Sequence, residues 1–319
     1  MRLTELLHRW WSGKASRATG KSPFCHDMAE AIRATCYSGL TCCNDLYRQS
    51  LPVYVEMVNL ARHAGCRRIL ELGAGLSTGL WARYADQTAA EVTSVCADFA
   101  PTRSYLSQAP EGDLLDRRVR CVEGFTVSAD QMKQFYAADP RDSLAGVPVR
   151  ELAATLHHFS RPVSAGRANR RTERLEQQFG GSATASDILI SGNKLEFPPD
   201  LLDLYCEEPR FSDMLDVLRQ AETEGRAGLH EGLDGGWDLI FFDSGELSTI
   251  VEWQQLQHRV PVGGFVALHD IYFPKSLKSC LACAAIVADP SWDVVFVDNT
   301  TPQGLLIARR NSQKESSPC

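Results

Sequence analysis

The sequence predicts an α/β domain built on a mostly parallel β-sheet, and three observations support this. A short apolar run at 68–72 passes through a glycine-containing turn into a helical pattern. Further short apolar runs that end near an acid recur along the chain, as buried parallel strands do between helices. The segments 292–298 and 303–309 flank a Thr-Thr-Pro turn and predict an antiparallel strand pair near the end of the chain.

The N-terminal region, residues 1–50, is predicted to be a helical cap outside the sheet. Its first part, Met1 to Trp11, is amphipathic but lacks the uninterrupted apolar core and cleavage site of a secretion signal. We expect it to pack on the domain or on a second subunit. The segment Gln49 to Ala64 predicts a helix that leads into the first strand, because apolar residues recur on one side of it. These residues are Leu51, Val55, Val58 and Leu60.

The first strand and its turn carry the most informative motif of the chain. An acid, Glu71, is followed by two glycines spaced by one residue, Gly73 and Gly75, and a Ser-Thr pair then opens the helical pattern. The glycines permit a tight turn and close approach of a ligand, and the free amides of the helix start can bind ligand oxygens. A dinucleotide-binding fingerprint needs a third glycine where this chain has Thr78, so that pattern is broken.

The order Glu71-x-Gly73-x-Gly75 resembles motif I of the class I S-adenosylmethionine (SAM) dependent methyltransferases. With Ser77-Thr78 after it, the motif is similar to the small-molecule O-methyltransferase branch. The resemblance implies a Rossmann-like fold: a mostly parallel seven-stranded sheet with a C-terminal antiparallel pair, here with a helical cap and a large insert. It also implies that the acid helps to hold the methionine end of SAM and that the glycines admit it. The cofactor-binding residues expected in this turn are Glu71, Gly73, Ala74, Gly75, Ser77 and Thr78.

The second and third strands are expected at 91–98 and 118–124. In the family that the motif resembles, an acid at the end of the second strand binds the ribose hydroxyls. That position falls on Cys96, with Asp98 two residues later, and Glu123 ends the next strand. The resemblance therefore implies that these three side chains lie beside the nucleoside. A competing position for the third strand is 187–193, whose sequence also resembles a strand and turn.

The fourth and fifth strands, 237–243 and 260–270, each deliver an acid. The first ends in Asp243, and the second ends in His269-Asp270. Because ligands in open α/β sheets bind at the carboxyl ends of the strands, these side chains are expected to meet the glycine turn. Asp243 is expected to contact the cofactor as well.

Two mechanisms remain open for activating an acceptor hydroxyl. In one, Asp243 and Asp270 share a Mg²⁺ ion that lowers the pKa of the hydroxyl. The metal-dependent members of the family add an Asp or Asn beside the second acid, where this chain has His269 and Ile271. In the other, His269 is the general base, although a buried imidazole that only holds the strand end is an equal alternative. The catalytic candidates are therefore Asp243, His269 and Asp270.

The connection between the third and fourth strands, 125–236, is too long for a bare loop and predicts an inserted subdomain or lid. An arginine-rich stretch at 160–186 within it is expected to be a surface loop or part of that lid. The SAM-binding core would then comprise 51–124 and 237–310, and 311–319 is expected to be a disordered tail.

Composition excludes some classes of protein. The chain has 319 residues and a formal net charge of −7, which argues against a nucleic-acid substrate. No apolar run reaches membrane-spanning length, so no membrane insertion is expected. The 11 cysteines are odd in number and scattered, which predicts reduced thiols in a cytoplasmic protein. Cys280-x-x-Cys283 has no matching second pair and does not predict zinc.

The sequence therefore predicts a SAM-dependent methyltransferase, most readily one that methylates an oxygen of a small molecule or sugar-bearing metabolite. Three alternatives stay open at this point. They are a SAM-binding regulator or partner without catalysis, a nicotinamide-dependent oxidoreductase, and an enzyme that transfers the aminocarboxypropyl group of SAM. A homodimer is compatible with the sequence.

Overall fold

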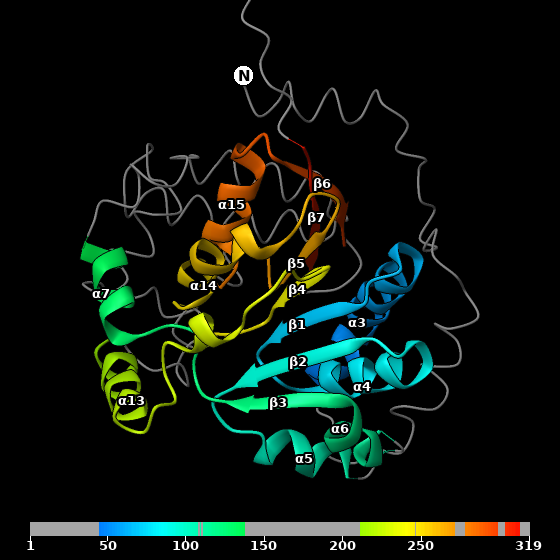
Figure 1. Cartoon of the computed structure of the whole chain (residues 1–319), viewed down its shortest axis with the longest axis horizontal. Helices are drawn as coiled ribbons and strands as arrows, with labels where there is room; N and C mark the ends of the chain where they lie inside the picture. The colour runs from blue at the N-terminus through cyan, green and yellow to red at the C-terminus, as the bar shows by residue number, and fades with distance from the viewer. Residues whose placement is uncertain are drawn as a thin grey trace, which may run out of the picture.

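The computed structural model describes residues 45–107, 109, 111–137, 211–245, 247–271, 278–298 and 304–312. Within these residues seven strands form one sheet in the order β3-β2-β1-β4-β5-β7-β6 (Figure 1). Strands β1 to β5 are mutually parallel, and β7 runs antiparallel to both of its neighbours. The predicted mostly parallel, seven-stranded sheet with a C-terminal antiparallel strand is thus confirmed. The strands are β1 (Arg68–Leu72), β2 (Glu91–Cys96), β3 (Val119–Glu123), β4 (Leu239–Phe242), β5 (Phe265–His269), β6 (Trp292–Val297) and β7 (Leu305–Arg310).

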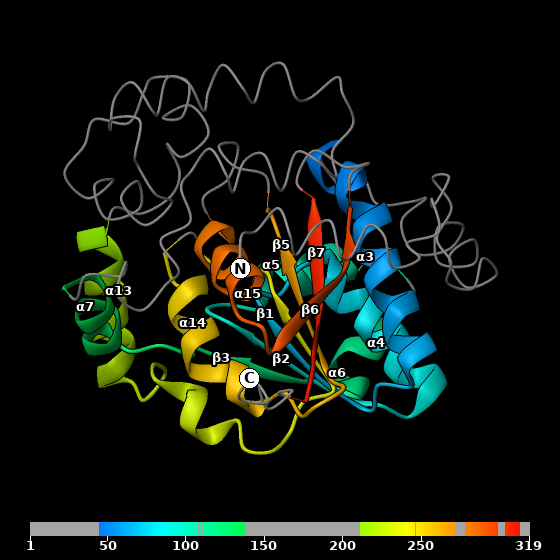
Figure 2. The same ribbon diagram turned by 90° about the horizontal axis from the view of Figure 1, so that it is seen from above.

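Helices cover both faces of this sheet (Figure 2). One face, called the α3 face below, carries α3 (Asp45–Ala64), α4 (Leu76–Thr88), α5 (Ala100–Leu106) and α6 (Gly112–Arg118). The other, called the α14 face, carries α7 (Ala129–Ala137), α13 (Phe211–Thr223), α14 (Thr249–Leu256) and α15 (Cys280–Ala288). Two short 3-10 turns, η1 (Leu229–Gly232) and η2 (Gln257–Arg259), precede β4 and β5.

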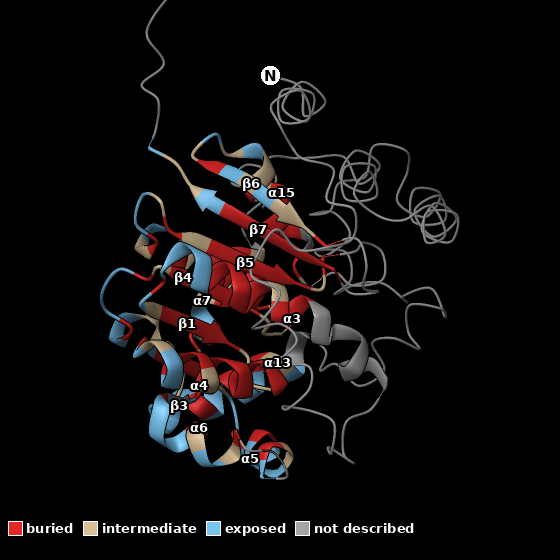
Figure 3. Ribbon diagram, turned by 90° about the vertical axis from the view of Figure 1, so that its right-hand side faces the viewer, coloured by how far each residue is buried: buried red, intermediate tan, exposed pale blue. Residues whose placement is uncertain are grey.

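The central strand β4 is apolar and buried along its whole length, because helices cover both faces of the sheet there (Figure 3). Consecutive side chains of a strand point to opposite faces, so Ile69 packs on the α3 face and Leu70 on the α14 face. The same alternation places Phe241 on the α3 face and Phe242 on the α14 face. Two apolar layers therefore hold the strand ends in fixed register.

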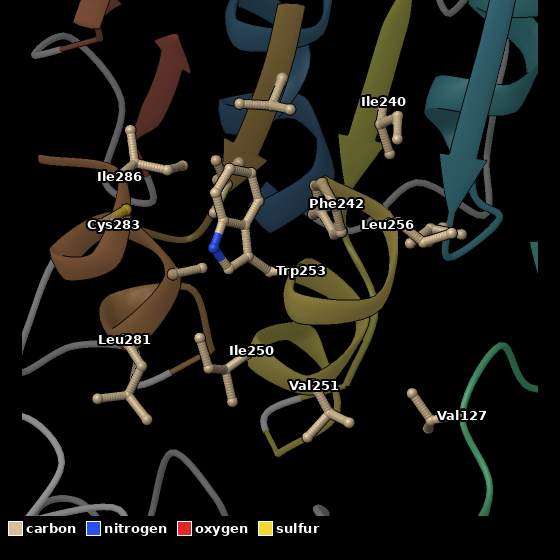
Figure 4. Packing of buried hydrophobic residues seen from close by; sticks show 14 of the residues in the cluster. Val127, Ile240, Phe242, Ile250, Val251, Trp253, Leu256, Leu281, Cys283 and Ile286 are labelled. Carbon is tan, nitrogen blue, oxygen red and sulfur yellow. The ribbon is translucent and has the colours of Figure 1, made fainter. Parts of the chain in front are cut away.

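Trp253 of α14 is one of three tryptophans in the buried cluster of the α14 face, with Trp237 and Trp292. Its indole lies between Phe242 of β4 and the α15 residues Leu281, Cys283 and Ile286 (Figure 4). Its ring centroid is 6.1 Å from that of Phe242 and 5.1 Å from that of Trp292. Cys283 is fully buried in this cluster and acts as a small apolar group.

The third strand and the helix before β1 lie at positions that the sequence predicted. The third strand lies at Val119–Glu123, as the first of the two positions predicted, and the alternative at 187–193 lies outside the described residues. The predicted helix at Gln49 to Ala64 is α3, which begins at Asp45. The rest of the cap (1–44), the arginine-rich stretch and most of the tail also lie outside the described residues.

The two described ends of the segment 125–236 belong to the α14 face. Met132 and Phe135 of α7 and Leu218 of α13 are buried in the same apolar cluster as Phe242. The ends of the expected insert therefore cover the sheet, while residues 138–210 lie outside the described part of the chain. No helix in the described part combines the length and hydrophobicity needed to cross a lipid bilayer.

Candidate active site

The predicted site residues gather where the chain leaves β1, β4 and β5. Gly73 has φ +93°, and a Cβ there would lie 2.1 Å from the carbonyl oxygen of Asp243. The amide of Gly73 donates to Val95 of β2, and the amide of Asp243 donates to Leu72, each at 2.8 Å. Only glycine allows this close crossing. The turn thus lies against β4 at the point where the strand order reverses, which is the ligand-binding position in such sheets.

Gly75 lies at the start of α4 and differs from Gly73. Its amide donates to Thr78 Oγ1 at 2.9 Å, so the turn is closed by a side chain of the first helical turn. A Cβ on Gly75 would meet no atom within 4 Å. The space beside Gly75 is therefore open, and this is the space a ligand would need.

Glu71 lies beneath this turn and is fully buried. Its Oε1 accepts a hydrogen bond from Ser77 at 2.6 Å, and its Oε2 accepts from Thr78 at 2.7 Å and Ser94 at 2.6 Å. Burial raises the pKa of Glu71 to about 7, because it outweighs the three hydroxyl donors. The carboxyl group therefore ties the turn to β2. The direct cofactor contact expected of Glu71, Ser77 and Thr78 stays a prediction.

The ends of β2 and β3 bring the three nucleoside candidates to one edge. Cys96 is paired in register with Glu123. Asp98 is exposed and accepts a hydrogen bond from the amide of Ala100 at 2.8 Å, which fixes the start of α5. Glu123 is also exposed and lies 3.5 Å from the guanidinium of Arg103. Two carboxylates thus lie where the neighbouring strands β2 and β3 end, at the edge of the sheet where a ligand would bind.

The acids after β4 and β5 meet as the sequence predicted. Asp243 Oδ1 lies 3.1 Å from His269 Nδ1, and Asp270 Oδ2 lies 3.5 Å from the same nitrogen. Asp270 has φ +56°, a left-handed conformation that side-chain-bearing residues rarely adopt. Such a conformation at a strand end is typical of a functional site, and here it turns Asp270 toward Asp243.

A lysine completes this group. Lys278 Nζ lies 2.5 Å from Asp243 Oδ1 and 3.2 Å from Asp270 Oδ2, and its side chain is only 11% exposed. Tyr54 of α3 donates its hydroxyl to the other oxygen of Asp243 at 3.4 Å. We call Asp243, His269, Asp270 and Lys278 the ion-pair cluster.

The pKa directions within the ion-pair cluster follow from its charges. Burial alone would raise the pKa of Asp243, but Lys278 and His269 outweigh it and hold the pKa at about 2. Burial alone would lower the pKa of His269, but the carboxylates of Asp243 and Asp270 raise it. Asp243 is therefore a carboxylate at neutral pH.

His269 is not open to a substrate in the way a general base needs. The residue is 4% exposed, its ring packs 5.2 Å from that of Tyr54, and its Nδ1 faces the two carboxylates. Its Nε2 is buried and has no hydrogen-bond partner among the described residues. Burial thus favours the alternative in which the imidazole holds the strand ends.

A buried network supports the turn after Asp243. Glu252 of α14 accepts hydrogen bonds from Ser244 and, at 2.7 Å, from Thr126, which follows β3. Burial raises the pKa of Glu252 despite these donors. The ends of β3 and β4 are in this way joined beneath the ion-pair cluster.

Sequence reasoning missed Lys278 and Tyr54. Lys278 follows Asp270 by eight residues in a connecting segment, where no local pattern marks it. Tyr54 lies one residue before Val55 on the predicted helix, and its only signal is a hydroxyl beside an apolar stripe.

A cavity of about 480 Å³ opens elsewhere, at the amino ends of the strands, between Arg68, Asp116 and Trp237. Two of the charged residues that line it, Arg68 and Glu91, form an ion pair at 3.6 Å. None of the predicted site residues lines it, so we place the site at the carboxyl edge.

Comparison with known proteins finds no family model and no curated protein that matches the chain. Among solved structures, cofactor-bound Rv0187 from MTB is 15% identical with TM-score 0.38, and the match covers 96% of each chain. The O-methyltransferase TomG from Streptomyces achromogenes, in complex with SAM, is 12% identical with TM-score 0.38 and coverage of 98% and 100%. An O-methyltransferase from Bacillus cereus, in complex with SAH, is 11% identical with TM-score 0.39 and coverage of 89% and 97%. At such identities and TM-scores these likenesses decide nothing about the activity of this chain.

Proposed function

We propose that the chain is a SAM-dependent methyltransferase that transfers a methyl group to an oxygen of a small-molecule acceptor. The observation that carries this proposal is the crossing of Gly73 with Asp243. It places the glycine turn of β1 against the ion-pair cluster at the reversal point of a sheet with an antiparallel β7. The turn proposed to bind the cofactor and the residues proposed to hold the acceptor are therefore neighbours.

The same features argue against a nicotinamide cofactor. A dinucleotide-binding domain has six parallel strands and a third glycine at the helix start. Here β7 is antiparallel, and Thr78 is buried at that position with its hydroxyl bonded to Glu71. A pyrophosphate could therefore not approach the start of α4 as closely as it does in a domain with glycine at this position.

The chain's residues divide into two groups around the bound cofactor, which supplies an electrophilic methyl carbon on a sulfonium. The backbone of Gly73, Ala74 and Gly75 would admit the amino-acid end of the cofactor. The space beside Gly75 is open, since a Cβ there would meet no atom within 4 Å. Asp98 and Glu123, at the ends of β2 and β3, would accept hydrogen bonds from the ribose hydroxyls. Glu71 keeps the turn in shape through Ser77 and Thr78.

The acceptor would be held by the ion-pair cluster. Asp270 is its most exposed carboxylate, with 22% of its side chain accessible, and Asp243 follows with 15%. Either carboxylate would accept a hydrogen bond from the acceptor hydroxyl and aim the hydroxyl oxygen at the methyl carbon. As the new C–O bond formed, the C–S bond of the cofactor would break, S-adenosylhomocysteine would leave, and the hydroxyl proton would pass to that carboxylate. Positioning of this kind is the largest contribution that a protein makes to an in-line displacement. His269 and Lys278 fix the two carboxylates.

A reducing, cytoplasmic environment and a homodimer belong to the same proposal. Among the described residues, Cys66, Cys96, Cys121 and Cys283 form no disulfide bond. Free thiols suit a reducing compartment. The negative net charge again argues against a nucleic-acid acceptor.

Titration calorimetry with SAM tests the proposal. In Gly75→Val the new side chain fills the space beside the turn, so we expect affinity to fall by about tenfold or more. Gly232→Val is the matched control, because a Cβ there also meets nothing within 4 Å but lies on η1, away from the glycine turn. Equal affinity of both variants and the wild type would contradict the proposal.

Turnover is measured separately with radiolabelled SAM and a panel of hydroxyl-bearing metabolites. Methyl transfer that Gly75→Val reduces and Gly232→Val does not is the expected result. Binding of SAM without transfer to any acceptor would favour a regulatory partner. Binding of a nicotinamide cofactor in place of SAM would favour an oxidoreductase.

A further inference from the structure

The ion-pair cluster contains a cation, the ammonium group of Lys278, that contacts both of its carboxylates. The ammonium of Lys278 is within hydrogen-bond distance of one oxygen of Asp243 and one of Asp270, the acids that end β4 and β5. Its side chain is almost nine-tenths buried. It therefore differs from a surface lysine that swings freely in water.

The backbone around Lys278 is anchored. The next residue, Ser279, is fully buried, and its hydroxyl donates to the carbonyl oxygen of His269 at 2.5 Å. Ser279 also precedes α15, whose Leu281 and Cys283 are buried in the α14 face. The start of α15 is thus fixed to the end of β5, and the lysine that precedes it is brought to the two carboxylates.

This arrangement bears on a divalent cation at the same place. Ligand atoms of Asp243, His269 and Asp270 lie within 4.8 Å of one another, so by spacing alone they could share an ion. A divalent ion would lie about 2.0–2.6 Å from the carboxylate oxygens. The Lys278 ammonium already contacts those oxygens, and His269 Nδ1 already faces Asp243 Oδ1 at 3.1 Å. Two cations cannot share this space, since their repulsion in a buried site is strong.

We infer that Lys278 takes the place of a divalent metal ion in this site, and that the ion-pair cluster works as an internal, metal-independent clamp on Asp243 and Asp270. Lys278 is then a positioning residue that fixes the two carboxylates that meet the acceptor. The inference rests on the proposed function only for the identity of that acceptor. The exclusion of a metal concerns the geometry of the cluster and holds or fails without SAM.

Manganese binding tests this inference directly, because bound Mn²⁺ loses its free-ion electron paramagnetic resonance signal. Wild type is expected to leave the signal unchanged. Lys278→Met removes the charge but keeps the length, and is expected to bind Mn²⁺ at least about tenfold more tightly than wild type. Lys278→Arg keeps the charge and should again exclude the ion. Lys133→Met is the matched control, since Lys133 is an exposed lysine of α7 that lies 3.7 Å from Asp130 and outside the ion-pair cluster.

Three outcomes would overturn the inference. They are Mn²⁺ binding by wild type that Asp243→Asn abolishes, equal binding by wild type and Lys278→Met, and absence of binding in both. Circular dichroism melting identifies a variant that does not fold, and Lys278→Gln then replaces Lys278→Met. A second measurement needs no variant: methyl transfer by wild type should be unchanged by EDTA, whereas a loss that Mg²⁺ restores would contradict the clamp. If SAM does not bind at all, the manganese result still decides the present inference and the proposed function alone fails.

Discussion

Two acids at the carboxyl edge of the same sheet, the buried Glu71 and the half-buried Asp243, have pKa values that are shifted in opposite directions. Glu71, in β1, receives three neutral hydroxyl donors, and burial raises its pKa to about 7. Asp243, after β4, also loses water, but Lys278 and His269 hold its pKa at about 2. At Glu71 the three neutral donors do not offset the desolvation of the carboxylate, whereas at Asp243 the two cations outweigh it. The first acid therefore shapes a turn, and the second keeps a charge beside the acceptor.

The largest effect is expected from Asp243→Asn. This change removes the carboxylate that Lys278 and His269 share, and breaking a buried ion pair leaves charge without compensation. The free energy of unfolding at pH 7, measured by urea denaturation, should fall by about 3 kcal/mol. A variant as stable as wild type would show that the ion-pair cluster does not stabilise the fold.

The pH dependence of the same variant sharpens this test. The folded pKa of Asp243 lies below its ordinary value of 3.8, so its stabilising contribution is present above about pH 4 and is lost as the pH falls toward 2. Wild type should lose about 2 kcal/mol across this window through Asp243. Asp243→Asn should lack that part of the acid-induced decline.

A smaller effect with the opposite sign is expected from Glu71→Gln. The folded pKa of Glu71 lies above its ordinary value of 4.5, so its contribution is complete below pH 4.5 and is lost as the pH rises through about 7. The variant should match wild type at pH 5 and be more stable by about 2 kcal/mol at pH 8. The pairwise comparison cancels the contribution of His269, which also declines as the pH rises. A variant less stable than wild type at pH 8 would contradict the proposed difference between the acids.

The fold was largely predictable because its signals are local. The apolar runs and the Glu71-x-Gly73-x-Gly75 turn lie within a few residues of one another, and parallel strands bring their carboxyl ends to one edge. For the same reason Asp243, His269 and Asp270 could be expected to meet. The competing third strand could not be excluded by sequence, because both segments have a strand-like pattern.

The partners of the acids were less predictable because they come from distant parts of the chain. Ser94 reaches Glu71 from the neighbouring strand, and Tyr54 reaches Asp243 from a helix 189 residues earlier. Lys278 depends on the path between β5 and α15 and on the anchoring of Ser279. Without these partners, sequence reasoning left open whether a metal or an imidazole serves the acceptor.

A crystal structure of the chain grown with S-adenosylhomocysteine would show directly whether the glycine turn binds the cofactor. We expect the amino-acid end of that ligand beside Gly73 and Gly75, its ribose at Asp98 and Glu123, and its sulfur facing Asp243 and Asp270. Binding of the nucleoside in the cavity at Arg68 and Trp237, with the glycine turn closed by protein side chains, would contradict this expectation.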